Sequence, residues 1–258
     1  IFKSGDGGQT WQNMGLAESH HIGRVLIDPQ NADVVYVAVI GHLYTTNTER
    51  GLYKTTDGGQ SWQKVLYIND NTGVIDLAMD PADSSTLYAT TWQRSRKAWG
   101  HTAYGKQSGI YKSTDAGQTW KRLTTGLPEG EHVGRFAIDV AASNPNVLYA
   151  ICDCRQRDEG VYRSTDKGET WQQVNEEPVR AGYDFCLIKI SPDNEDEIYL
   201  PGQRTYTSQD GGKTYRQIGG TIVHLLGHDS PVLHLDTHDM WIDPSNTDHL
   251  ILGNDGGL

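Results

Sequence analysis

The sequence has few cysteines, few basic residues and no long apolar run, and each shortage excludes a class of protein. Its cysteines, Cys152, Cys154 and Cys186, are an odd number. They predict no disulfide framework and do not identify a compartment. No apolar run approaches the roughly 18 residues of a membrane-spanning helix. Acidic residues outnumber basic ones by 33 to 22, and the net charge of −11 disfavours nucleic acid and anionic membranes as partners.

Glycine and β-forming residues are abundant by contrast, and they are organised as a repeat. The 29 glycines accompany long stretches in which Val, Ile, Leu and Tyr alternate with polar residues. This pattern predicts an all-β protein with many tight turns. An eight-residue box recurs at intervals of roughly 50 residues. Its copies are SGDGGQTW from Ser4, TTDGGQSW from Thr55, STDAGQTW from Ser113, STDKGETW from Ser164 and SQDGGKTY from Ser208.

Each box has the composition of a hairpin turn. Its aspartate can accept hydrogen bonds from nearby backbone N–H groups, and its glycine supports positive φ. Its final aromatic residue can bury a large area between neighbouring sheets. The boxes are therefore interpreted as structural turns in preference to a ligand site. Their aspartates are Asp6, Asp57, Asp115, Asp166 and Asp210.

A second landmark alternates with the boxes: an apolar strand, a short polar turn and another apolar strand. LAMDPADSSTLYATT and MWIDPSNTDHLILG are two examples. Each unit thus has strands A and B around the polar turn and strands C and D around the box, which is the blade of a β-propeller. The sequence predicts one domain, residues 1–258: a five-bladed propeller with four antiparallel strands per blade. The complementary ends predict closure, with Ile1–Trp11 and Met240–Leu258 sharing one blade. The alternative is a fragment of a larger propeller whose ends are cut within a blade.

The boxes resemble the Asp-box repeats of sialidases, xyloglucanases and sortilin-type receptors. Segments such as ESHHIGRVLIDP, VAVIGHLY and THDMWIDPSNTDHLILGNDGG resemble more closely large bacterial secreted proteins with sortilin-like propellers, often labelled as glycosyl hydrolases. The resemblance covers nearly the whole chain and implies a propeller fold. It also implies a secreted or periplasmic location, although the chain shows no signal peptide. The arginine triad and Tyr–Glu pair of sialidases are not recognisable.

Loops D–A and B–C should lie on the face opposite the boxes, and nine of the ten histidines fall in them. If the ring closes, residues at one offset on the innermost strands converge on the axis. This register places imidazoles and carboxylates around the channel mouth, a ligand set suited to zinc or another divalent transition metal. The alternative is a polar channel with ordinary hydrogen-bonding histidines. The predicted ligands are His21, His132, His234, Asp236 and His238.

Other loop residues predict substrate contacts and acid–base groups. Asp184 or Glu131 would act as general acid or base. Aromatic residues of the first long loop could stack on a sugar, and the alternative is that they pack among themselves. Two arginines could hold an anionic group of the substrate, and the alternative is that they pair with carboxylates of the protein. These candidates are Trp92, Trp99, Tyr104, Arg24 and Arg135. Cys152 and Cys154 are either metal ligands or structural or exposed thiols.

The leading interpretation is a metal-dependent hydrolase or lyase, with zinc the first choice, that acts on a carbohydrate at the channel mouth. The carbohydrate part follows from the resemblance and the loop aromatics, and the metal part from the register. The alternative is a non-catalytic propeller that binds a peptide or glycan on the same face. The sequence leaves the substrate and the oligomeric state open.

Overall fold

The computed structural model describes residues 1–155, 158–175, 185–219 and 234–257. Within them the chain forms antiparallel sheets, and each sheet is built from strands close together in sequence. The other regular element is the short 3-10 helix η1 (Ala17–Ser19). None of the helical residues described forms a segment long and apolar enough to cross a membrane.

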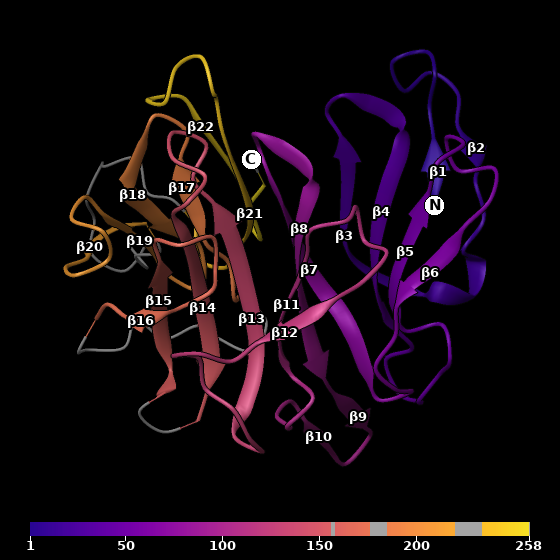
Figure 1. The fold of residues 1–258 in the computed structure, drawn as a ribbon, viewed down its shortest axis with the longest axis horizontal. Helices are drawn as coiled ribbons and strands as arrows, with labels where there is room; N and C mark the ends of the chain where they lie inside the picture. Colours follow the sequence, from indigo (N-terminus) through magenta and orange to yellow (C-terminus); the bar gives the residue numbers. More distant parts are fainter. Residues whose placement is uncertain (156–157, 176–184, 220–233, 258) are drawn as a thin grey trace.

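Four sheets have the predicted four strands in sequential order (Figure 1). The first blade comprises β3 (His21–Asp28), β4 (Asn31–Gly41), β5 (Gly51–Thr55) and β6 (Gln63–Leu66). The second comprises β7 (Thr72–Asp80), β8 (Asp83–Gln93), β11 (Gly109–Ser113) and β12 (Lys121–Leu123). The third comprises β13 (Val133–Val140), β14 (Leu148–Cys154), β15 (Gly160–Ser164) and β16 (Gln172–Gln173). The fourth comprises β17 (Lys189–Ser191), β18 (Asn194–Leu200), β19 (Thr205–Ser208) and β20 (Arg216–Gly219).

Three two-stranded hairpins complete the described structure. An insertion in the second blade forms β9 (Ser95–Lys97) and β10 (Gly100–Thr102). The N-terminal hairpin has β1 (Phe2–Lys3) and β2 (Gln12–Asn13), and the C-terminal hairpin has β21 (Thr237–Ile242) and β22 (Leu250–Asn254).

The boxes connect strands C and D, as the sequence predicts. The carboxylate of each box aspartate accepts hydrogen bonds from its own turn. In the third blade the Ser164 and Thr170 hydroxyls donate to the Asp166 carboxylate at 2.8 and 2.6 Å, and the Thr170 N–H donates at 2.9 Å. The other four boxes repeat this network. Hydrogen bonds led by the Thr119 hydroxyl lower the pKa of Asp115 to about 2. The turns therefore favour the charged carboxylate.

The core lies between successive blades. In the second and third blades, buried side chains from facing sheets form one cluster that includes Tyr88, Ile110, Phe136 and Trp171. Tyrosines also reach across blades: the Tyr36 hydroxyl donates to Ala116 O, and the Tyr88 hydroxyl to Lys167 O, each at 2.9 Å. Apolar packing and these bonds hold adjacent blades together.

The predicted closure of the ring by a shared terminal blade is wrong. The strands β1–β2 and β21–β22 form separate sheets, so the described chain has four complete blades and a half-blade at each end. Each hairpin packs on the blade next to it along the chain. The Trp62 indole N–H donates to Met14 O at 2.7 Å, whereas Met240 and Ile242 pack with Tyr199.

One ion pair nevertheless links the first blade to the last hairpin. Arg24 of β3 donates through Nε to Asp76 of β7 at 2.9 Å, and its NH1 lies 3.5 Å from Asp239 of β21. The innermost strands therefore approach one another without sharing a sheet.

Candidate functional site

The loop side contains the candidate site, and its histidines have local partners. Two of the predicted metal ligands pair with carboxylates: His132 Nε2 lies 2.5 Å from Asp158 Oδ2, and His238 Nε2 lies 2.8 Å from Asp255 Oδ1. His21 Nδ1 lies 3.0 Å from Gly41 O.

The other two predicted ligands lie in the segment that precedes β21. His234 Nδ1 lies 2.8 Å from Leu235 O. Asp236 adopts a positive φ of 64°, and its N–H donates to Gln203 O at 3.3 Å.

The five predicted ligands do not form one group in the described structure. The group of three ligand-bearing side chains that does converge there is Glu18, His20 and His42. The predicted ligand set assumed that residues at equivalent positions of different inner strands meet, whereas His21, His132 and His238 each have a different local partner. Residue spacing could have indicated the other group, since His20 and His42 lie one residue beyond the His21–Gly41 pair of β3 and β4.

Arg24 serves the scaffold, whereas Arg135 lies against an aromatic ring. Asp76 raises the pKa of Arg24, burial opposes it, and Asp239 adds to the increase. This pairing matches the structural alternative for Arg24, although its partners are Asp76 and Asp239. The Arg135 guanidinium lies 5.9 Å from the ring centroid of Trp92.

The aromatic residues of the insertion divide into buried and exposed ones. Trp92 is only 2% exposed and donates to Ala103 O at 2.8 Å, so the prediction that it stacks on a sugar is wrong. Its large ring fills the core beneath the insertion. The Tyr104 hydroxyl donates to Asp153 at 3.2 Å, and Arg155 covers the Tyr104 ring at 4.4 Å. Trp99, at the turn between β9 and β10, is 87% exposed.

Of the two predicted acid–base residues, the structure describes one. Glu131 is exposed next to His132 of the His132–Asp158 pair, two residues before β13. Asp184 lies outside the described residues.

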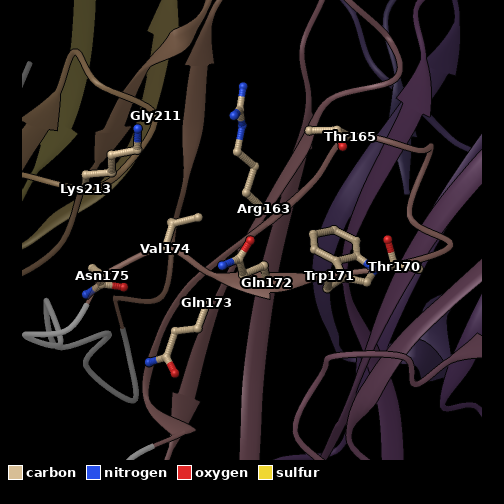
Figure 2. Close-up of a pocket in the computed structure, with 10 residues that line it drawn as sticks. All are labelled: Arg163, Thr165, Thr170, Trp171, Gln172, Gln173, Val174, Asn175, Gly211 and Lys213. Carbon is tan, nitrogen blue, oxygen red and sulfur yellow. The ribbon is translucent and has the colours of Figure 1, made fainter.

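A separate polar groove of about 960 Å³ lies beside the fourth box (Figure 2). Arg163 of β15, Gln172 and Gln173 of β16 and Lys213 of the fifth box contribute to its lining. Its amide and cationic groups can donate hydrogen bonds to hydroxyl or carbonyl oxygens. None of its lining residues is one that the sequence predicts to be catalytic or metal-binding.

The cysteines correct another prediction. Cys152 and Cys154 form a disulfide, although the sequence predicted no disulfide framework. They are two positions apart on the same face of β14, and their Cα atoms are 5.4 Å apart where the pairing with β13 is irregular. Cys186 is a buried thiol, and burial raises its pKa to about 12. A metal role for the Cys152–Cys154 pair does not fit the disulfide.

Four-stranded sequential sheets that pack face to face and are marked by box turns define a β-propeller protein. The chain belongs to the Sortilin-Vps10 family, whose model, described as sortilin, neurotensin receptor 3, matches residues 1–158. The predicted resemblance to sortilin-like propellers labelled as glycosyl hydrolases is confirmed.

Several curated relatives are xyloglucanases. The chain is 26% identical over 256 residues to xyloglucanase Xgh74A of Acetivibrio thermocellus, covering 84% of this chain and 28% of that protein. It is 29% identical over 210 residues to a probable oligoxyloglucan-reducing end-specific xyloglucanase of Neosartorya fischeri, covering 77% of this chain and 22% of that protein. The chain therefore spans under a third of the length of these relatives.

Solved structures show the same fold. An ancestral GH74 enzyme matches with a TM-score of 0.72 at 19% identity, covering 98% of this chain and 32% of that structure. YCF48 bound to D1 peptide matches with a TM-score of 0.54 at 16% identity, covering 93% of this chain and 64% of that structure.

Proposed function

We propose that the protein is a glycoside hydrolase that acts on a xyloglucan-type oligosaccharide. Similarity to xyloglucanases over about three quarters or more of the chain carries this proposal. Trp99 supports a place for the substrate, because an exposed indole can cover the apolar face of a sugar ring. The Lys97 ammonium donates to Tyr44 O at 3.3 Å and ties the Trp99 hairpin to the loop after β4.

Glu131 is the proposed acid–base residue in the described structure. Glycoside hydrolysis requires two carboxyl groups, one of which protonates the leaving oxygen while the other acts on the opposite face. Asp184, which the sequence offers as the alternative to Glu131, is the proposed second group. Zinc dependence also remains a proposal, but the five ligands predicted for it do not meet, and the group at Glu18 is considered separately below.

The test is an assay of oligosaccharide cleavage with two single variants. Glu131→Gln should lower kcat by at least about 100-fold, since it removes the acid–base group. Trp99→Ala should raise KM about three- to tenfold with little change in kcat, since it removes ground-state stacking. Trp241→Ala, which alters another exposed tryptophan, is the control. Unchanged kinetics in both test variants would refute these assignments.

A binding propeller is the second candidate, because the family model that matches is that of a receptor. In that case a peptide or glycan would bind without turnover, on the same loop face. Calorimetric binding of an oligosaccharide that stays intact after prolonged incubation would favour this candidate over the enzyme.

A secreted or periplasmic location is part of the proposal. The Cys152–Cys154 disulfide supports it, because disulfides persist in oxidising compartments.

A further inference from the structure

We propose that Glu18, His20 and His42 bind a divalent transition metal ion, for which Zn²⁺ is the best match. Each side chain offers one ligand atom, and these atoms lie within 4.8 Å of one another. The residues come from two loops, the one that contains η1 before β3 and the one that follows β4. This site is independent of the proposed glycosidase activity.

The two imidazoles are brought together by the pairing of β3 with β4. A β-bridge joins His20 to Gly41, which places His20 beside His42 at the ends of adjacent strands. Their ring centroids are 3.8 Å apart and the ring planes are tilted by 49°. A single cation can therefore be reached by one nitrogen of each ring.

His42 has a nitrogen that a metal would satisfy. Its Nε2 is buried and has no hydrogen-bond partner within the protein. A buried polar atom without a partner is costly, so such an atom indicates a missing interaction. His42 Nδ1 lies 2.9 Å from the Thr45 hydroxyl oxygen. When Nδ1–H donates to that oxygen, Nε2 carries the lone pair that a metal requires.

The main chain of His42 is fixed by a buried arginine and an asparagine. The His42 N–H donates to Asn47 Oδ1 at 3.1 Å, and Arg50 donates to His42 O at 3.1 Å. Arg50 is only 1% exposed and also donates to Asn71 O and Arg94 O, at 2.7 and 3.0 Å. These bonds anchor the loop to its neighbours and limit the loss of entropy on ligand binding.

The other arm of the site is held in an unusual conformation. His20 has φ 54° and ψ −91°, a combination that residues with a Cβ rarely adopt. The buried Ser19 beside it donates through its hydroxyl to Leu16 O at 2.6 Å. Such strain persists only where the surroundings enforce it, and it is concentrated at functional sites.

The ligand set selects the class of metal. Two imidazoles and one carboxylate suit Zn²⁺, and the same set accepts Co²⁺, whereas Ca²⁺ and Mg²⁺ prefer oxygen ligands alone. Glu18 and His20 are exposed, so a fourth position would be open to water. The ion would cross-link the loop before β3 to the loop after β4.

The test uses the chain without a histidine tag. Zn²⁺ titration followed by metal analysis should give about one ion per chain, and Co²⁺ should give visible bands of low coordination number. His42→Ala should weaken Zn²⁺ binding by about 100-fold or more, and Thr45→Val by about tenfold, since outer hydrogen bonds orient the ligand. Zn²⁺ should raise the Tm of the wild-type protein and leave that of His42→Ala unchanged.

Matched variants keep the result decisive. His249→Ala removes an exposed histidine from the turn between β21 and β22 and should bind Zn²⁺ like the wild type. Glu18→Gln changes an exposed residue while keeping its shape, and should weaken binding even if His42→Ala fails to fold. Unaltered Zn²⁺ affinity in Glu18→Gln and His20→Ala would overturn the proposal. The proposal would also be overturned if Zn²⁺ binding were lost only in a His21→Ala, His238→Ala double variant, a result that would favour the ligands predicted from the sequence.

Discussion

The first and fourth boxes have the same local structure and very different surroundings. Asp6 and Asp166 accept hydrogen bonds of the same lengths, 2.8, 2.9 and 2.6 Å, from their own turns. Yet Trp11, which ends the first box, is 63% exposed, whereas Trp171, which ends the fourth, is 6% exposed. The box sequence thus determines the turn, and a neighbouring blade determines whether the turn contributes to the core.

Replacement of the two tryptophans gives the largest expected difference. Trp171→Ala should lower the free energy of unfolding by about 3–5 kcal/mol, because it leaves a cavity beside Leu123 and Leu127. Trp11→Ala should change it by less than about 0.5 kcal/mol. Urea unfolding of both variants measures the contrast. Equal losses would show that the box, and not the neighbouring blade, sets the contribution.

Two glycines with positive φ, one next to the buried Trp171 and one in the exposed first box, allow the same comparison to be made at the backbone. Gly126 has φ +82°, and a Cβ there would lie 1.9 Å from Trp171 O. Gly126→Ala should therefore cost about 2 kcal/mol or more, since it adds a clash to the conformational strain. Gly7, in the first box, has φ +69° and open space around it. Gly7→Ala carries the strain alone, and a larger Tm loss for it than for Gly126→Ala would contradict the comparison.

Acid sensitivity gives the smallest expected difference. Hydrogen bonds led by the Thr214 hydroxyl lower the pKa of Asp210 to about 2, from an ordinary value of 3.8. A depressed folded-state pKa stabilises the protein above pH 4, and this contribution disappears as pH falls towards 2. Asp210→Asn should therefore flatten the fall of Tm between pH 4 and 2. Hydrogen bonds led by the Thr10 hydroxyl also lower the pKa of Asp6 to about 2, so Asp6→Asn should flatten the profile by a similar amount, and a flattening confined to one of the two variants would contradict this.

Local features were predictable from the sequence, and long-range ones were not. The box turns and the four-strand order follow from glycine, aspartate and alternation within about 50 residues. Closure depended on contacts between Ile1–Trp11 and Met240–Leu258, which no local pattern specifies. The predicted metal ligands also depend on contacts between blades, since His21, His132 and Asp236 lie at or just before different inner strands.

Two site features were nevertheless present as short-range signals. The β3–β4 pairing places His20 beside His42, and the two-residue spacing of Cys152 and Cys154 places both thiols on one face of a strand. Antiparallel register is therefore a better guide to this site than equivalent positions in different blades. The burial of Trp92 was one of two alternatives that the sequence left open, because it depends on how the insertion folds back over the ring.

The sequential order of the sheets has a consequence for how the chain folds. Every blade is a meander of neighbouring strands, so the first one, from His21 to Leu66, contains all of its own pairing partners. Such local topology favours fast folding and allows blades to form one after another as the ribosome releases the chain. The contact of Arg24 with Asp239 must wait until the last hairpin has emerged. That ion pair therefore forms later than the strand pairing within the first blade.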